Sequence, residues 1–175
     1  MIARPTLLQG DDLIVAADHG QIYILSAALD DPAEVDANPY LDALDDAVQS
    51  GRFVGVVPGL IDLMTPGQWN FRTPLRIEVW TAEPVSDTGD WEHEVDVDLA
   101  VPDGRLHIEA SGGGLLQRHQ VPPANYRVRV SGRAFTVLGF NGAAGHDSYR
   151  LQLWPAVGPR PPALRKRWPG WDDYR

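Results

Sequence analysis

The sequence predicts an all-β protein, mainly antiparallel, built as a β-sandwich with one short helix and an irregular C-terminal tail. Three observations support this fold class. Several segments alternate apolar and polar residues with period two, as half-buried strands do. The chain holds 17 Gly and 15 Pro, which suits many short strands joined by turns. Its 175 residues suit a single domain with a substantial core, and 43% of them are hydrophobic.

The first strands are expected at residues 13–17 and 21–27, joined as a hairpin. Asp18, His19 and Gly20 lie between them, and Asp and Gly tolerate the backbone angles of a tight turn. Residues 53–64 are strand-like but broken by a Pro58-Gly59 turn signal, and residues 74–80 form a clear alternating strand pattern.

The single helix is expected to begin at Asn38 and Pro39, because Asn caps free N–H groups and Pro is tolerated in the first turn. It should end at Gly51. Three apolar residues at helical spacing predict its buried stripe: Leu41, Leu44 and Val48.

The clearest strand pattern lies at residues 91–99. Alternate positions there place an acidic row on the outer face of the sheet: Glu92, Glu94, Asp96 and Asp98. The same alternation recurs at residues 106–110, 126–130 and 149–153, with Arg127, Arg129 and Arg150 facing outward. Cross-strand pairing with these arginines would explain the acidic row without any functional role.

The end of the chain differs from the rest. Residues 159–175 are Pro-rich, basic and aromatic, and we expect them to pack as a tail on a β-sandwich domain of residues 1–158. Trp168, Trp171 and Tyr174 are the residues expected to make this contact.

The charge of the chain either keeps the protein dispersed in solution or attracts a basic protein partner. The net charge is −9, and residues 1–159 carry 10 basic and 22 acidic side chains. Such a body is repelled by phosphates, so direct nucleic-acid binding is not expected. Residues 30–46 hold seven acids and no basic residue. This stretch is either a docking surface or a solvated loop and helix face.

Enzymatic activity is not expected, because no catalytic motif is present. The chain has no cysteine, and its five histidines are scattered without metal-ligand spacing, so neither a metal site nor a cofactor is predicted. The acidic row could supply the carboxylate pair of a glycosidase, but cross-strand pairing explains it more simply. The N-terminus lacks a signal-peptide pattern and no apolar run could span a membrane, so we expect a cytoplasmic protein without a membrane partner.

Two sets of residues are candidates for binding. A basic protein partner would contact acids of the helix and of the acidic row: Asp42, Asp45, Asp46, Glu92, Glu94, Asp96 and Asp98. The alternative is a small-ligand module with an aromatic pocket formed by Trp69, Phe71 and Trp80.

Two segments, residues 95–111 and 120–130, resemble the ComJ family, the competence-protein J inhibitors of a DNA-entry nuclease. Like that family, they contain a strand, a turn with Pro102 and Gly104, a strand ending near Ser111, and Pro123-x-x-Tyr126 opening the next strand. Residues 126–130 and 149–155 also resemble segments of bacterial proteins of high-GC type. The ComJ resemblance implies a β-rich fold and an inhibitor or immunity-type role against a nuclease.

Overall fold

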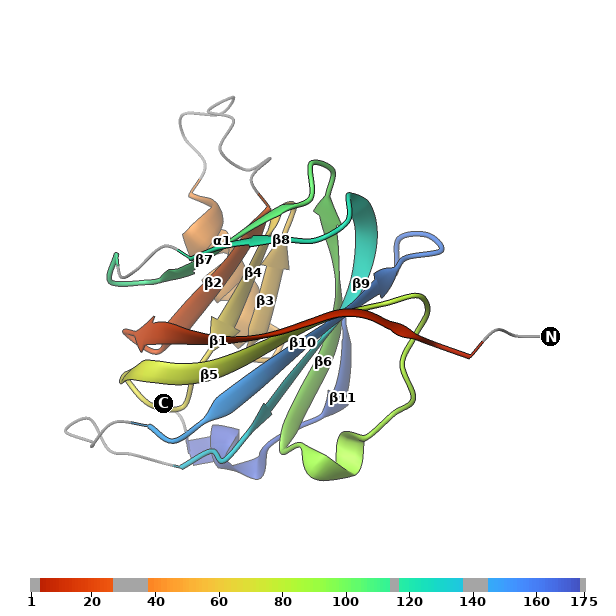
Figure 1. Ribbon diagram of the computed structural model, residues 1–175. Helices are drawn as coiled ribbons and strands as arrows, with labels where there is room; N and C mark the ends of the chain where they lie inside the picture. Colours follow the sequence, from red (N-terminus) through yellow and green to blue (C-terminus); the bar gives the residue numbers. More distant parts are fainter. Residues whose placement is uncertain (1–3, 27–37, 114–116, 137–144, 174–175) are drawn as a thin grey trace.

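The computed structural model describes residues 4–26, 38–113, 117–136 and 145–173. These residues form eleven strands, one α-helix and two short 3-10 helices (Figure 1). The strands are β1 (Leu7–Asp18), β2 (Gln21–Ser26), β3 (Val54–Val57), β4 (Leu60–Met64), β5 (Trp69–Trp80), β6 (His93–Val101), β7 (Arg105–Ala110), β8 (Gln117–Gln120), β9 (Ala124–Arg133), β10 (Ser148–Pro155) and β11 (Ala163–Lys166). The helices are α1 (Pro39–Gln49), η2 (Thr88–Asp90) and η3 (Pro169–Asp173). None of the helices described is long and apolar enough to cross a membrane.

The predicted all-β class is confirmed, but the sheet is mixed. Its strand order is β11-β6-β9-β10-β5-β1-β2-β4-β3, with β7 beside β2 and β8 beside β7. The pair β5–β10 is parallel, whereas every other pair is antiparallel. A parallel pair needs a crossover connection, and here residues 81–147 supply it.

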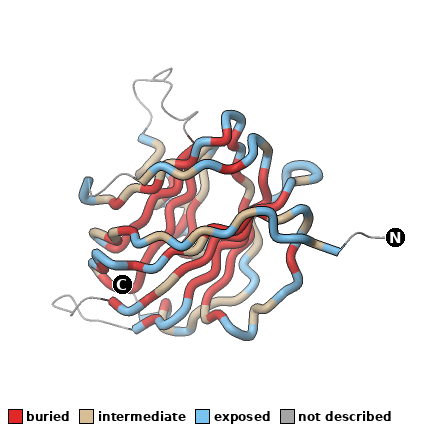
Figure 2. The backbone as a smooth tube through the Cα atoms, viewed as in Figure 1, coloured by how far each residue is buried: buried red, intermediate tan, exposed pale blue. Residues whose placement is uncertain are grey.

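The predicted division into two sandwiched sheets is not confirmed, because hydrogen bonds join all the strands into one sheet. The junction is narrow: β1 and β2 pair only at Asp18 and Gln21, next to their hairpin turn. Beyond that turn β1 follows β5 and β2 follows β4 and β7. Strands on the two sides of this junction share one core, which includes Ile24 of β2 and Val97 of β6. Figure 2 shows buried residues along the strands on both sides of the junction.

The local signals of the first hairpin are confirmed. Residues 18–21 connect β1 to β2 directly, and His19 and Gly20 have φ values of 51° and 74°. Positive φ at both central residues is the geometry of the turns that suit two-residue hairpins. The tight connection fixes the register at Asp18 and Gln21.

Helix α1 begins as predicted but is rotated away from the predicted orientation. The Asn38 side chain accepts a hydrogen bond from Leu41 N at 3.3 Å. The buried residues are Ala43 and Ala47, whereas Leu41 and Val48 are 57% and 52% exposed, so the predicted buried stripe is wrong.

The close approach of α1 to β3 explains this rotation. A Cβ atom on Gly55 would lie 1.7 Å from the carbonyl oxygen of Ala43. Only small side chains fit at so short a separation, so the alanine face of the helix is turned toward the sheet.

The C-terminal tail contributes to the core. Strand β11 pairs with β6, and Trp171 is only 2% exposed and stacks on Phe53 with ring centroids 4.1 Å apart. Trp168 is half-buried and packs against the same core. Tyr174 lies outside the described residues, and the boundary at residue 158 stays a prediction.

Candidate protein-binding surface

The acidic row of β6 does not face solvent throughout. Glu94 and Asp96 are 0% and 4% exposed, so the expectation of an open acidic face is wrong for these two residues. In the register of the sheet, Asp96 lies opposite Arg129 and Asp98 opposite Arg127. The corresponding ion pairs are 2.9 Å long in both cases. Cross-strand pairing therefore accounts for Asp96 and Asp98.

The other contacts of the row come from segments that cross the outer face of the sheet. Glu94 accepts hydrogen bonds from Thr88 Oγ1 (2.7 Å) and Ser131 Oγ (2.9 Å). Glu92 accepts one from the backbone N–H of Phe135 at 2.8 Å. From the tail, Arg160 N donates to Asp98 Oδ2 at 2.6 Å. A partner would have to displace these internal contacts to reach the row.

Arg129 is the centre of this buried network. It is 0% exposed and forms ion pairs with Asp96 (2.9 Å), Glu83 (2.8 Å) and Glu94 (3.8 Å). Burial alone would lower the pKa of Arg129, but the hydrogen bonds and charges of Asp96, Glu83 and Glu94 raise it. Its guanidinium also lies 5.1 Å from the ring centroid of Trp154. A charge buried this deeply needs such partners, so the network is structural.

The acids of α1 have a different environment. Asp42 and Asp45 are exposed and form no ion pair with a residue in the described parts of the chain. Asp46 bonds to Arg52 Nη2 at 2.5 Å and accepts from the backbone N–H of Val56 at 2.9 Å. Asp46 therefore ties the helix to β3, while Asp42 and Asp45 remain available. The acids of residues 30–36 lie outside the described residues.

A hollow of about 410 Å³ adjoins this helix, between α1 and the β1–β2 turn. Its lining includes Leu41 and Leu44 of the helix and Tyr23, Tyr40 and Ser111. The Tyr23 hydroxyl donates to Gln21 Oε1 at 2.5 Å and lies 3.3 Å from Ser111 Oγ. The Tyr23 hydroxyl of the wall thus already has hydrogen-bond partners within the chain.

The aromatic residues of the predicted ligand pocket are not brought together. Trp69 and Trp80 are the first and last residues of β5, and a strand of twelve residues spans roughly 36 Å at 3.3 Å per residue. Trp69 and Phe71 are 39% and 61% exposed at one end. At the other end, Trp80 Nε1 donates to Glu78 Oε2 at 3.0 Å.

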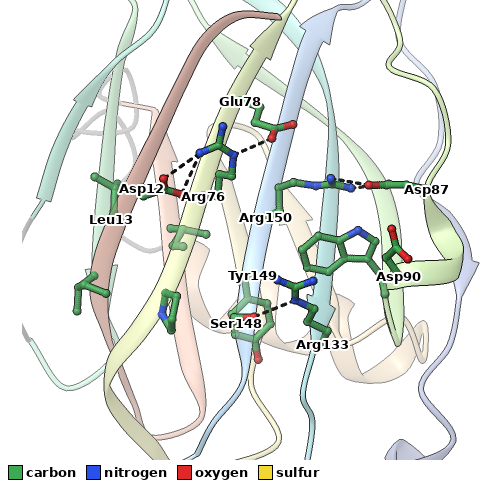
Figure 3. Close-up of a pocket in the computed structure, with 14 residues that line it drawn as sticks. Asp12, Leu13, Arg76, Glu78, Asp87, Asp90, Arg133, Ser148, Tyr149 and Arg150 are labelled. Carbon is green, nitrogen blue, oxygen red and sulfur yellow. Dashed lines mark hydrogen bonds and ion pairs between the residues drawn. The ribbon is translucent and has the colours of Figure 1, made fainter.

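A larger groove of about 660 Å³ lies on the outer face instead, over β1, β5 and β10 and beside residues 87–91 (Figure 3). Arg150 is bound to Asp87 by two hydrogen bonds of 2.6 and 2.7 Å, which lower the pKa of Asp87. Arg76 lies between Asp12 (3.0 Å) and Glu78 (2.8 Å). Burial would raise the pKa of Glu78, but hydrogen bonds from Gln152, Arg76 and Trp80 lower it.

One wall of this groove is the indole ring of Trp91. The guanidinium groups of Arg150 and Arg133 lie 4.5 and 4.8 Å from its centroid. Arg133 Nε also lies 3.4 Å from Ser148 Oγ, but Arg133 has no acidic partner among the residues that the structure describes. The alternating sequence pattern predicted the outward position of Arg150 but not the role of Asp87, because the polar loop that holds Asp87 carries no periodic signal.

The described residues contain no group of three or more His, Asp or Glu side chains suited to a metal ion. They do contain one unusual acid: Asp62 of β4 is 0% exposed, and neither carboxylate oxygen has a hydrogen-bond partner in the described chain. Burial raises the pKa of Asp62 to about 7. An acid within Leu60-Ile61-Asp62-Leu63-Met64 was the available signal for it.

Comparison with known proteins supports the fold and does not define a family. No family model matches the chain, and no curated protein matches it significantly. The solved structure of ComJ from Bacillus subtilis, an inhibitor of the DNA degrading activity of NucA, matches 88% of this chain and 100% of its own, with 16% identity and a TM-score of 0.54. The structure titled crocagin biosynthetic gene J matches 84% of this chain and 97% of its own, with 17% identity and a TM-score of 0.56. The chain is therefore similar in fold to ComJ, as the two resembling segments implied.

Proposed function

We propose that this protein is a non-enzymatic binding module that inhibits a basic protein partner, such as a nuclease. The observation that carries the proposal is the exposure of Asp42 and Asp45 on α1, where neither forms an ion pair with a residue that the structure describes. The fold likeness to ComJ, an inhibitor of a DNA-degrading activity, supports the choice of partner class. A nuclease must bind phosphates, so it presents a basic site that an acidic surface complements.

Within the seven acids predicted to bind a partner, the burial and pairing described above favour two. Asp42 and Asp45 are exposed, with no basic residue in the last turn of their helix. Asp46 would act by holding the helix in place. The β6 acids already have partners within the chain, since Glu94, Asp96 and Asp98 pair with arginines and Glu92 accepts from a backbone N–H, so they would add little to the surface field. Association is then steered by the charge of α1 and weakens as salt screens it.

Affinity capture from host lysate, eluted with increasing salt, tests the proposal. The wild-type protein should retain a basic protein at low salt and release it at high salt. The purified partner is then measured against a double variant, Asp42→Lys with Asp45→Lys, and against Asp90→Lys with Asp173→Lys. The control pair changes the net charge equally at two other exposed positions.

The α1 pair should lose affinity by at least about tenfold more than the control pair, or about 1.4 kcal/mol, at low salt. Its thermal midpoint should stay near that of the wild type, because exposed unpaired acids contribute little to stability. Equal losses from the two pairs would mean that only net charge matters and would remove α1 from the proposal. Failure to retain any basic protein would refute the function itself.

A second candidate is a small-ligand module, favoured by the groove of about 660 Å³ rather than by the predicted aromatic pocket. Its rigid wall includes Trp91, so ligand binding should change tryptophan fluorescence at high salt, where a charge-driven protein contact is lost. Trp91→Phe should abolish that change while Trp69→Phe keeps it.

A further inference from the structure

The packing of α1 places large apolar side chains outside and small ones inside. Ala43 and Ala47 contact the sheet through Gly55, while Leu41 and Val48 are more than half exposed and Leu44 is half-buried. A helix that only covers a sheet gains stability by burying its largest apolar residues. Two residues of the apolar stripe, Leu41 and Val48, are therefore unused by the chain's own core, whereas Leu44 packs partly against it.

This stripe continues into the hollow between α1 and the β1–β2 turn, because Leu41 and Leu44 also line that hollow. The rings of Tyr23 and Tyr40 meet edge to face there, with centroids 4.8 Å apart. Since the Tyr23 hydroxyl is already bonded to Gln21 and Ser111, an apolar side chain can enter beside it without leaving that hydroxyl unpaired.

The acids lie beside the stripe. At 100° per residue, Asp45 projects between Leu41 and Val48 on one side and Asp42 on the other. The last turn holds no basic residue, and the charged side chains of α1 itself are all acidic. Charge of one sign around an apolar centre excludes acidic proteins and selects basic ones.

We propose that α1 is a docking helix for a protein surface in which an apolar side chain is surrounded by Lys or Arg. The docking face consists of Leu41, Leu44, Val48, Asp42 and Asp45, together with the hollow. The partner's apolar side chain enters the hollow, and its basic groups meet the two carboxylates. This inference rests on the proposed function and adds its recognition mode. The apolar anchor slows dissociation of the complex, and the acids speed association and select a basic partner.

Site-specific crosslinking tests whether this face touches the partner. A photoreactive benzoylphenylalanine at position 41 should crosslink in host lysate to the same basic protein that salt elution releases. The same residue at position 157, which is fully exposed, is the control. No crosslink from position 41 above that control would overturn the proposal.

Affinity of the purified partner then separates the apolar and charged parts. Leu41→Ala with Val48→Ala should weaken binding by about tenfold or more, both at low salt and at about 0.5 M salt. Alanine favours the helix, so stability should not fall. The control, Val85→Ala with Val157→Ala, removes two even more exposed apolar side chains elsewhere and should leave affinity unchanged.

The outcomes distinguish this inference from the proposed function. Wild-type affinity in the Leu41 and Val48 variant, with sensitivity to Asp42→Lys and Asp45→Lys retained, would overturn the docking mode and leave an acidic inhibitor. Insensitivity to both sets would overturn the two together. Loss at all salt concentrations in the apolar variant, and loss that grows at low salt in the acidic variant, is the result expected here.

Discussion

Replacing Asp62 with Asn should stabilise the protein in a pH-dependent way. Asp62 pairs with Tyr23 and Gly55 in the sheet register, on the face that α1 covers. Burial raises its pKa from 3.8 to about 7. The folded protein therefore holds a proton that the unfolded chain releases above pH 4. Over the roughly three pH units between these values, each unit costs about 1.4 kcal/mol of folding free energy, or about 4 kcal/mol in total.

Asn has nearly the shape of the protonated acid and does not titrate. At pH 4 the Asp62→Asn variant should match the wild type, because both side chains are neutral. Above pH 7 it should be more stable by up to about 4 kcal/mol, since ionisation no longer opposes folding. Urea unfolding at half-unit steps from pH 4 to 8, followed by tryptophan fluorescence and circular dichroism, measures the difference between the two proteins at each pH.

The comparison of the variant with the wild type at each pH is needed because the ionisation of His93 changes the stability over the same pH range in the opposite direction. His93 Nε2 donates to Arg52 O at 2.6 Å and Nδ1 accepts from Trp168 N at 3.2 Å, so the buried ring is neutral. Burial lowers its pKa from 6.5 to about 4. Its stabilising contribution is complete above pH 6.5 and is lost as pH falls through 4, about 3 kcal/mol in all. Between pH 4 and 6.5 the free energy of unfolding of the wild type should therefore be nearly constant, whereas that of the Asp62→Asn variant should rise with pH.

Two results would refute this reasoning. A stability difference that does not change between pH 4 and 8 would mean that Asp62 keeps an ordinary pKa. A loss of stability at every pH would mean that its carboxyl group has partners that Asn cannot replace. Asp45→Asn, which removes an exposed carboxylate instead of a buried one, is the control.

The remaining predictions concern packing. Gly55→Ala should cost at least about 2 kcal/mol, because its Cβ would overlap the Ala43 carbonyl, whereas Gly89→Ala, with nothing within 4 Å, should be neutral in urea unfolding. Trp171→Ala should cost about 3–5 kcal/mol, since the ring is 2% exposed and stacked; a loss below 1 kcal/mol in the same assay would show that the tail is dispensable. Asp96→Ala should cost about 3–5 kcal/mol by leaving Arg129 short of a buried partner, and partner affinity of the folded fraction should be unchanged; a stable variant with weakened binding would contradict the structural role.

The strands and the start of the helix follow from local chemistry. Alternation places Val95, Val97 and Leu99 on one face whatever lies above it, and positive φ suits the short turn at residues 19–20. The Asn38 cap needs only neighbouring backbone. The exposed helix positions of Asp42 and Asp45 in the candidate site could also be predicted, because helical periodicity is likewise a local property of the sequence.

Burial of the acidic row required information from distant segments. Periodicity showed that Glu94 and Asp96 share a face, but Arg129, Thr88 and the C-terminal strand determine that this face is covered. The outer groove likewise combines residues from β1, β5, β9, β10 and the 87–91 loop, which no local pattern relates.

The sequence by itself determined an all-β chain, its hairpin, its capped helix and its excess of acid, because each depends on neighbouring residues and on composition. The tertiary structure alone decided the parallel pairing of β5 with β10, the rotation of α1 and the pairing of the β6 acids. The physical reason is that a side chain's face is set by backbone geometry, whereas its exposure depends on what packs against that face. At α1 the deciding contact was a glycine in β3, close enough to the helix to admit only alanines.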